Sequence, residues 1–249
     1  MSSTRTKLGI ALVAVALVTV GLSAVWADIA TPRPQWTMVR MESETVGITL
    51  GEKKVAVEAT FNMYNEGKAG PVKMGYPVGL FETDLKDFVV TIDDKAIENV
   101  KTEAGVPATE GPMMRGNGQP ESYRFEGPYK QWKVWEVAME ERAPKVIKLK
   151  YWVEPAKIKD AEKGDLLFYS YTLKTGATWK GKVNKAVVTV TLDGVTPDRI
   201  VRSLPVGAVA SNAGKTLTWT MASFKPTDNI DITFRPSAAI KTAALTGRR

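Results

Sequence analysis

Two residue types are missing from this sequence of 249 residues, cysteine and histidine. Without histidine there is no serine–histidine–aspartate or cysteine–histidine machinery, no imidazole general base and no common zinc site. Without cysteine there is no thiolate nucleophile, disulfide, iron–sulfur cluster or lipid anchor on a cysteine. We therefore expect no cofactor, no metal and no catalytic residue of the usual kinds.

The N-terminus has the order of regions that is typical of a secretory signal peptide. Arg5 and Lys7 precede an apolar run over residues 8–20, and Val25-Trp26-Ala27 places Val and Ala before a cleavage point. This order predicts a signal peptide over residues 1–27 and export to a periplasm, the cell surface or the medium. The same segment is long enough to be retained as a membrane anchor instead. No other stretch could cross a membrane, so we expect no membrane span after cleavage.

The charge balance argues against a nucleic-acid partner. The net charge of +7 falls to +5 when residues 1–27 are removed, because that segment holds two basic residues and no acid. Three more cations, Lys241, Arg248 and Arg249, lie in the last stretch, 236–249, which we predict to be a flexible basic tail. The remaining body has scattered lysines and no basic helix, so it lacks the footprint of a nucleic-acid binder.

Alternation of apolar and polar residues dominates the rest of the chain and predicts β-strands. We expect strands over residues 38–50, 53–64, 72–76, 87–92, 133–139, 146–153, 166–173, 185–192, 216–221 and 229–234. Many short strands separated by polar turns indicate an all-β protein. The fold class that fits best is an antiparallel, immunoglobulin-like β-sandwich.

The strands group into one or two domains. An extended lead-in over residues 28–35 precedes a sandwich domain over 36–155. Residues 156–235 form a second β-sheet unit, which is either a separate domain or part of the same sandwich. Within it, only the stretch 156–163 has a helical composition.

Several motifs resemble those of a known group of proteins. They are Asn65-Glu66-Gly67, Met74-Gly75-Tyr76-Pro77 and the run YTLKTGATWKG from Tyr171 to Gly181. Over roughly residues 36–237 the chain resembles a family of exported bacterial β-rich proteins of unknown function. The resemblance implies export and a strand-rich body, and it implies no activity.

Taken by their residue types, these motifs predict turns and packing. The Asn-x-Gly sequence between two strands predicts a tight reversal, since Asn and Gly tolerate a positive φ. Gly176 allows close folding of a loop in which Trp179 covers the end of the core, with Trp219 as its partner across the sandwich. Asp93-Asp94 is interpreted as a hairpin tip rather than as a calcium site with Glu98.

A long stretch without strand periodicity, residues 104–122, is rich in glycine and proline and is followed by a cluster of aromatic residues. Loops of this length inside a compact domain are often functional. We expect an exposed ligand-binding surface made of Tyr123, Phe125, Tyr129 and Trp132. Such rings stack on sugars or anchor a protein partner. Trp135 should be a core residue, and the alternative is that the whole cluster closes the end of the core.

The sequence thus favours an exported, non-catalytic binding or structural module of the bacterial cell envelope that contacts a glycan or protein partner. One alternative is a carboxylate-dependent enzyme on an envelope polysaccharide, which needs two carboxylates across a cleft. Another is a self-assembling surface or filament subunit that pairs through exposed edge strands.

Overall fold

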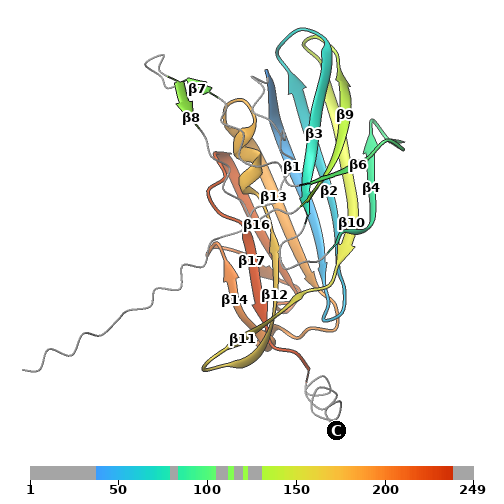
Figure 1. Cartoon of the computed structure of the whole chain (residues 1–249). Coiled ribbons are helices and arrows are strands. Elements are labelled where there is room, and N and C mark those ends of the chain that lie inside the picture. Colours follow the sequence, from blue (N-terminus) through green and yellow to red (C-terminus); the bar gives the residue numbers. More distant parts are fainter. Residues whose placement is uncertain (1–37, 79–83, 105–111, 115–119, 123–130, 238–249) are drawn as a thin grey trace, which may run out of the picture.

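The computed structural model describes residues 38–78, 84–104, 112–114, 120–122 and 131–237 (Figure 1). Within them the protein is nearly all-β, which confirms the predicted class. The helices of the described residues are two short 3-10 turns, η2 (Lys174–Thr178) and η3 (Pro197–Arg199). The predicted signal peptide and lead-in lie outside the described residues, and the immunoglobulin-like arrangement stays a prediction. No helix of the described part is both long and apolar enough to cross a membrane.

One layer of the protein is an eight-stranded sheet in the order β15-β16-β13-β1-β2-β10-β4-β5. Its strands are β1 (Val39–Leu50), β2 (Val55–Asn65), β4 (Lys86–Ile92), β5 (Lys95–Ala96), β10 (Pro144–Val153), β13 (Val183–Leu192), β15 (Val209–Ser211) and β16 (Thr216–Phe224). β1 is antiparallel to β2 and parallel to β13, with Ser43 opposite Lys185. Segments far apart in the sequence therefore meet at the centre of one sheet.

Two smaller sheets pack on one face of the large sheet (Figure 1). The first has the order β3-β9-β6 and consists of β3 (Gly70–Val78), β6 (Lys101–Ala104) and β9 (Gln131–Met139). The second has the order β11-β12-β17-β14 and consists of β11 (Ala156–Asp160), β12 (Gly164–Tyr171), β14 (Ile200–Leu204) and β17 (Ile230–Phe234). The hydroxyl of Tyr76 on β3 bonds that of Tyr151 on β10, and Tyr171 on β12 bonds Glu44 on β1. Both smaller sheets are thus tied to the large one by buried side chains.

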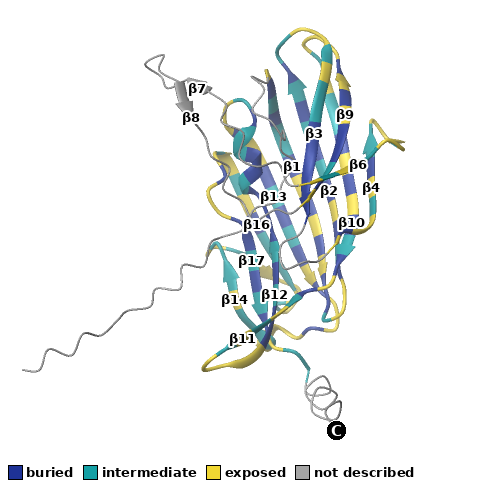
Figure 2. Ribbon diagram, viewed as in Figure 1, coloured by how far each residue is buried: buried dark blue, intermediate teal, exposed yellow. Residues whose placement is uncertain are grey.

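The buried residues between these layers form one hydrophobic core within the described part of the chain. Buried and exposed residues alternate along the strands of the large sheet (Figure 2). In β2, Val57 and Ala59 are buried while Glu58 between them is exposed, as a sheet with one solvated face requires. The core takes residues from both sides of Pro155, so the segments 36–155 and 156–235 share it.

The segment 156–163 is a strand and a turn, despite its helical composition. β11 pairs antiparallel with β12, placing Ala156 opposite Phe168. In the turn between them, the carboxylate of Asp160 accepts hydrogen bonds from the backbone N–H groups of Glu162 and Lys163. The backbone bonds of a sheet ladder outweigh the helix propensity of a charged segment this short.

Part of the predicted 104–122 loop is regular. β7 (Pro112–Met114) and β8 (Pro120–Ser122) pair as a two-stranded hairpin. The rest of this stretch, residues 105–111 and 115–119, lies outside the described residues.

The reversal after β2 depends on a side chain. Asn65 accepts a hydrogen bond from the N–H of Gly67 and donates to the backbone oxygens of Lys68 and Glu140. Neither Asn65 nor Gly67 has a positive φ, which corrects the predicted reason for this motif. Glycine fits at position 67 because a Cβ there would lie 2.8 Å from the Cβ of Met38.

The first two residues of the predicted tail are held in place. The carboxylate of Glu52 accepts hydrogen bonds from the N–H and hydroxyl of Ser237, and the same carboxylate pairs with Arg199. Because the sequence predicts that the rest of the tail, residues 238–249, buries little, truncation after Ser237 should leave the melting temperature within about 1 °C of the full chain. Truncation after Arg235 should lower it by about 2–6 °C, because charge-assisted bonds worth about 1–2 kcal/mol are lost. Calorimetry of both truncated proteins checks this, and equal melting temperatures would show that the Glu52–Ser237 contact contributes nothing.

Candidate functional site

Of the predicted aromatic surface, the structure describes Trp132 alone. Tyr123, Phe125 and Tyr129 lie outside the described residues. Trp132, on β9, is only 7% exposed, so the prediction of an exposed ring at this position is wrong. Since side chains alternate along a strand, Trp132 lies beside Val134 on the face of β9 opposite to Trp135, and it is buried there outside the core between the layers.

The residues predicted to have structural roles are all buried. Trp135, Trp179 and Trp219 are 2–3% exposed, and Gly176 is buried within η2. The indole N–H of Trp219 donates to the backbone oxygen of Pro205 at 2.7 Å. These residues fill the core and its ends.

Polar groups gather instead at the end of β12, where the chain enters η2. On the face of β12 that meets the large sheet, the Tyr171 hydroxyl donates to Oε1 of Glu44 at 2.8 Å. Glu44 is 1% exposed, and its Oε2 has no hydrogen-bond partner among the described residues. Burial raises the pKa of Glu44 to about 8, although the Tyr171 hydrogen bond acts in the opposite direction. The carboxyl is therefore mainly protonated at neutral pH.

The opposite face of β12 carries a second set of polar groups. Ser170 is paired with Asp231 of β17, and its hydroxyl donates to Oδ1 of Asp231 at 2.6 Å. Since side chains alternate along a strand, Ser170 lies on the face away from Tyr171. Burial raises the pKa of Asp231, and the Ser170 hydrogen bond offsets part of this effect. The pair is thus a half-buried combination of a hydroxyl donor and a carboxyl acceptor.

Buried polar residues continue this face beyond the ends of the two strands. The last residue pair between the strands is Tyr171 with Ile230. Thr172 follows Tyr171 and is 0% exposed, and Asn229 precedes Ile230 and is 4% exposed. Thr175, in η2, is 1% exposed. The hydroxyls of Thr172 and Thr175 have no hydrogen-bond partner among the described residues. Most buried hydroxyls in proteins are hydrogen-bonded, so two such groups near one strand end require an explanation.

A cation adjoins these residues. Burial lowers the pKa of Lys174, and the carboxylates of Asp228 and Asp231 act against this lowering, so both lie near its ammonium group. Six residues at this strand end combine hydroxyls, an amide, an ammonium and a carboxyl, and we call them the β12–β17 cluster: Ser170, Thr172, Lys174, Thr175, Asn229 and Asp231.

The loop that carries half of this cluster is fixed from two sides. The ammonium of Lys225 donates to the backbone oxygens of Ala177 and Trp179 at 3.0 and 3.1 Å. The N–H of Lys180 donates to the backbone oxygen of Val39 at the start of β1. Bonds from a charged donor to backbone carbonyls set the position of η2 relative to the sheets.

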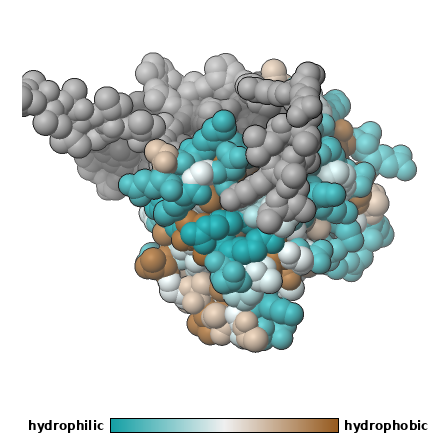
Figure 3. Space-filling model, turned by 90° about the horizontal axis from the view of Figure 1, so that it is seen from below, coloured by the Kyte–Doolittle hydropathy of each residue, from teal (hydrophilic) through white to brown (hydrophobic). Residues whose placement is uncertain are grey.

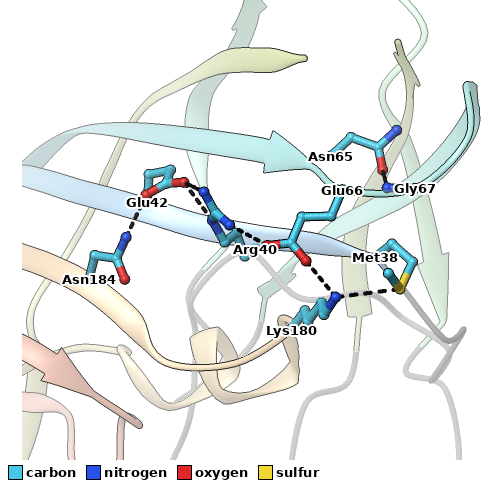
Figure 4. A network of polar contacts seen from close by, with 8 residues as sticks. All are labelled: Met38, Arg40, Glu42, Asn65, Glu66, Gly67, Lys180 and Asn184. Carbon is cyan, nitrogen blue, oxygen red and sulfur yellow. Dashed lines mark hydrogen bonds and ion pairs between the residues drawn. The ribbon is translucent and has the colours of Figure 1, made fainter. Parts of the chain in front are cut away.

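A network of ion pairs continues from this loop (Figure 4). Lys180 and Arg40 both contact the carboxylate of Glu66, and Arg40 also contacts Glu42. The two cations lower the pKa of Glu66, chiefly through their hydrogen bonds. All these side chains are partly exposed and matched in charge, so we interpret the network as a clamp on the β2–β3 turn rather than as a binding site.

The chemistry of the β12–β17 cluster is that of hydrogen bonding. Ser170, Thr172 and Thr175 offer hydroxyls, Asn229 offers an amide, and Asp231 accepts. The described residues contain no group of three or more acidic side chains that could hold a metal ion. The Asp93-Asp94 pair is a hairpin tip between β4 and β5, and its carboxylates are paired with Lys145 and Lys148.

Sequence reasoning singled out half of the residues of this cluster and assigned them to turns and packing. The run from Tyr171 to Gly181 stands out by resemblance, but its polar residues were interpreted as turn formers. Alternation across Tyr169 and Tyr171 already places Ser170 on the other face. The pairing of β12 with β17, which brings Asn229 and Asp231 alongside, depends on a register that no local pattern specifies.

Comparison with known proteins defines the fold. Neither a protein-family model nor a curated protein sequence matches the chain. A protein of Legionella pneumophila, described as a "putative nutrient binding protein", is similar with a TM-score of 0.65 and 16% identity, over 90% of this chain and 76% of that chain. An M1 zinc metallopeptidase of Deinococcus radiodurans is matched with a TM-score of 0.40 and 11% identity, over 79% of this chain and 42% of the peptidase. The first likeness shows a shared fold, and the second is too low to support any argument.

Proposed function

We propose that this protein is an exported, non-catalytic binding module of the cell envelope. Its ligand is a hydroxyl-rich molecule such as an envelope glycan, and the β12–β17 cluster holds it. The order of charged, apolar and small residues at the N-terminus supports export. The description of the Legionella protein agrees with a binding role.

The observation that carries this proposal is the Thr172 hydroxyl. It is fully buried and has no hydrogen-bond partner among the described residues. An unbonded hydroxyl inside a protein costs about 1–3 kcal/mol, and a valine of nearly the same shape would avoid that cost. Ser170, Lys174 and Asp231, which are partly exposed, surround the strand end with further donors and an acceptor. Alternating donors and acceptors of this kind match the hydroxyls of a sugar.

Thr172→Val tests the proposal because it removes the hydroxyl and keeps the volume. The variant should bind a glycan at least tenfold more weakly than the wild type. Its free energy of unfolding should be unchanged or slightly higher, because no internal hydrogen bond is lost. Binding is measured on a panel of immobilised bacterial cell-wall oligosaccharides, followed by calorimetry with the best binder, and stability by urea unfolding.

The matched control is Thr191→Val, which makes the same change at an exposed position on the outer face of β13. This variant should bind like the wild type. A loss of 1 kcal/mol or more of stability in Thr172→Val would show that the hydroxyl is bonded within the protein. A wild-type protein that binds no oligosaccharide of the panel would overturn the glycan proposal.

A further inference from the structure

Glu44 points into the core because of a bulge in β1. The pairing of β1 with β2 shifts between Met41 and Ser43, which leaves Glu42 as an extra residue. Before the bulge the buried side chains are at odd positions, and after it they are at even positions. A bulge re-aims the side chains that follow it, and here it turns an acidic residue inward. Without the bulge, the odd positions would remain inward and Glu44 would lie on the solvated face.

Nothing among the described residues compensates a charge at this place. Phe61 of β2 and Ala186 of β13 lie directly opposite Glu44, and both are apolar. On the β12 side, Glu44 contacts the hydroxyl of Tyr171, a titratable group that is neutral at neutral pH. A carboxyl in such surroundings keeps its proton well beyond its usual range, because the charged form would be unsolvated.

Tyr171 links this carboxyl to the ligand site. It is the last residue of β12, and its neighbours Ser170 and Thr172 both belong to the β12–β17 cluster. Its side chain is fully buried, and its hydroxyl reaches Glu44 across the space between the sheets. The Tyr171–Glu44 hydrogen bond therefore holds the end of β12, which presents Ser170 and Thr172, against the large sheet.

We propose that Glu44 is a positioning residue for the β12–β17 cluster: its protonated carboxyl anchors Tyr171, and loss of that proton releases the end of β12. An ionised Glu44 draws water or a cation into the core, and the strand end is the nearest place where the layers can open. The consequence for ligand binding rests on the proposed function, whereas the opening itself does not. Because burial raises the pKa of Glu44 to about 8, the release should occur in mildly alkaline solution.

Amide hydrogen exchange of the full-length protein between pH 6.5 and 9 tests this inference without any ligand. After correction for the intrinsic pH dependence of exchange, peptides covering residues 170–175 should exchange at least tenfold faster at pH 9 than at pH 6.5. Peptides from β2, residues 55–65, report global unfolding and should rise less than residues 170–175, because an equal rise in both would mean a general loss of stability alone.

Two variants complete the experiment. Glu44→Gln has no proton to lose and should give a flat profile over residues 170–175. Glu58→Gln, at an exposed position paired with Lys150, should keep the wild-type profile. A flat profile in the wild type, or the same rise in Glu44→Gln, would overturn the role of Glu44. If the exchange behaves as expected and no oligosaccharide binds, the positioning role stands and the glycan proposal fails.

Discussion

Trp132→Ala is expected to lower the free energy of unfolding by about 3–5 kcal/mol, as much as Trp135→Ala. Both rings are almost completely buried on β9, and the Trp135 ring lies 6.3 Å from that of Phe88. Trp135 belongs to the core between the layers and Trp132 is buried on the opposite face of β9, so removing either ring leaves a large cavity. The expectation replaces the one that follows from the sequence, in which Trp132 is a surface residue. Urea unfolding of the two variants measures the difference.

Trp152→Ala provides the matched control on the solvated side of the protein. Its ring lies on the outer face of β10 with the ammonium groups of Lys54 and Lys86 within 5.1 Å of its centroid, and its N–H donates to Asp87. The loss here should be about 1 kcal/mol, as for a partly exposed cation–π pair. A Trp132→Ala variant with a loss this small would restore Trp132 as a candidate binding residue.

The second large effect is the dependence of stability on pH that Glu44 confers. Its pKa is about 8 in the folded protein and has its ordinary value near 4.5 when the chain is unfolded. Between these values the folded state holds a proton that the unfolded state has lost, so stability falls as the pH rises. The slope is at most about 1.4 kcal/mol per pH unit. The contribution of Glu44 to the free energy of unfolding is therefore fully present below about pH 4.5 and is lost as the pH rises to about 8.

Glu44→Gln should remove this slope. Glutamine keeps an oxygen that can accept the Tyr171 hydrogen bond, and it does not titrate. Relative to the wild type, the variant should gain stability from pH 5 to pH 8, by up to about 4 kcal/mol over the range. Urea unfolding at four pH values checks this. Parallel curves for the two proteins would mean that Glu44 is charged in the folded state or already exposed to water.

The regular strands of the large sheet could be predicted from the sequence because one face of each is solvated. In β2 the alternation of Val57, Glu58 and Ala59 fixes both the element and its buried side. β14 and β11 could not be found in this way. Their residues are mostly half-buried or exposed, so hydrophobic periodicity is weak, and their pairing with β17 and β12 defines them.

The candidate site was harder to predict for two physical reasons. Glu44 belongs to a strand in which the alternation of buried and exposed residues shifts by one position at Glu42. In the sequence, such a bulge looks the same as an irregular strand end. Asp231 and Ser170 meet through strand pairing between segments 61 residues apart. The burial of Trp132 could not be predicted for another reason: an aromatic residue beside a glycine-rich loop has the same sequence pattern whether its ring is exposed or buried.

The parallel pairing of β1 with β13 has a consequence for how the chain folds. β1 and β2 can form a hairpin early, but one edge of β1 then has open backbone groups until residues 183–192 are available. Contacts of such high sequence separation slow folding, and an open edge invites pairing with another chain. The sheet closes only when most of the polypeptide is present. A protein built in this way has little chance of folding before its synthesis is complete, which is compatible with the export proposed above.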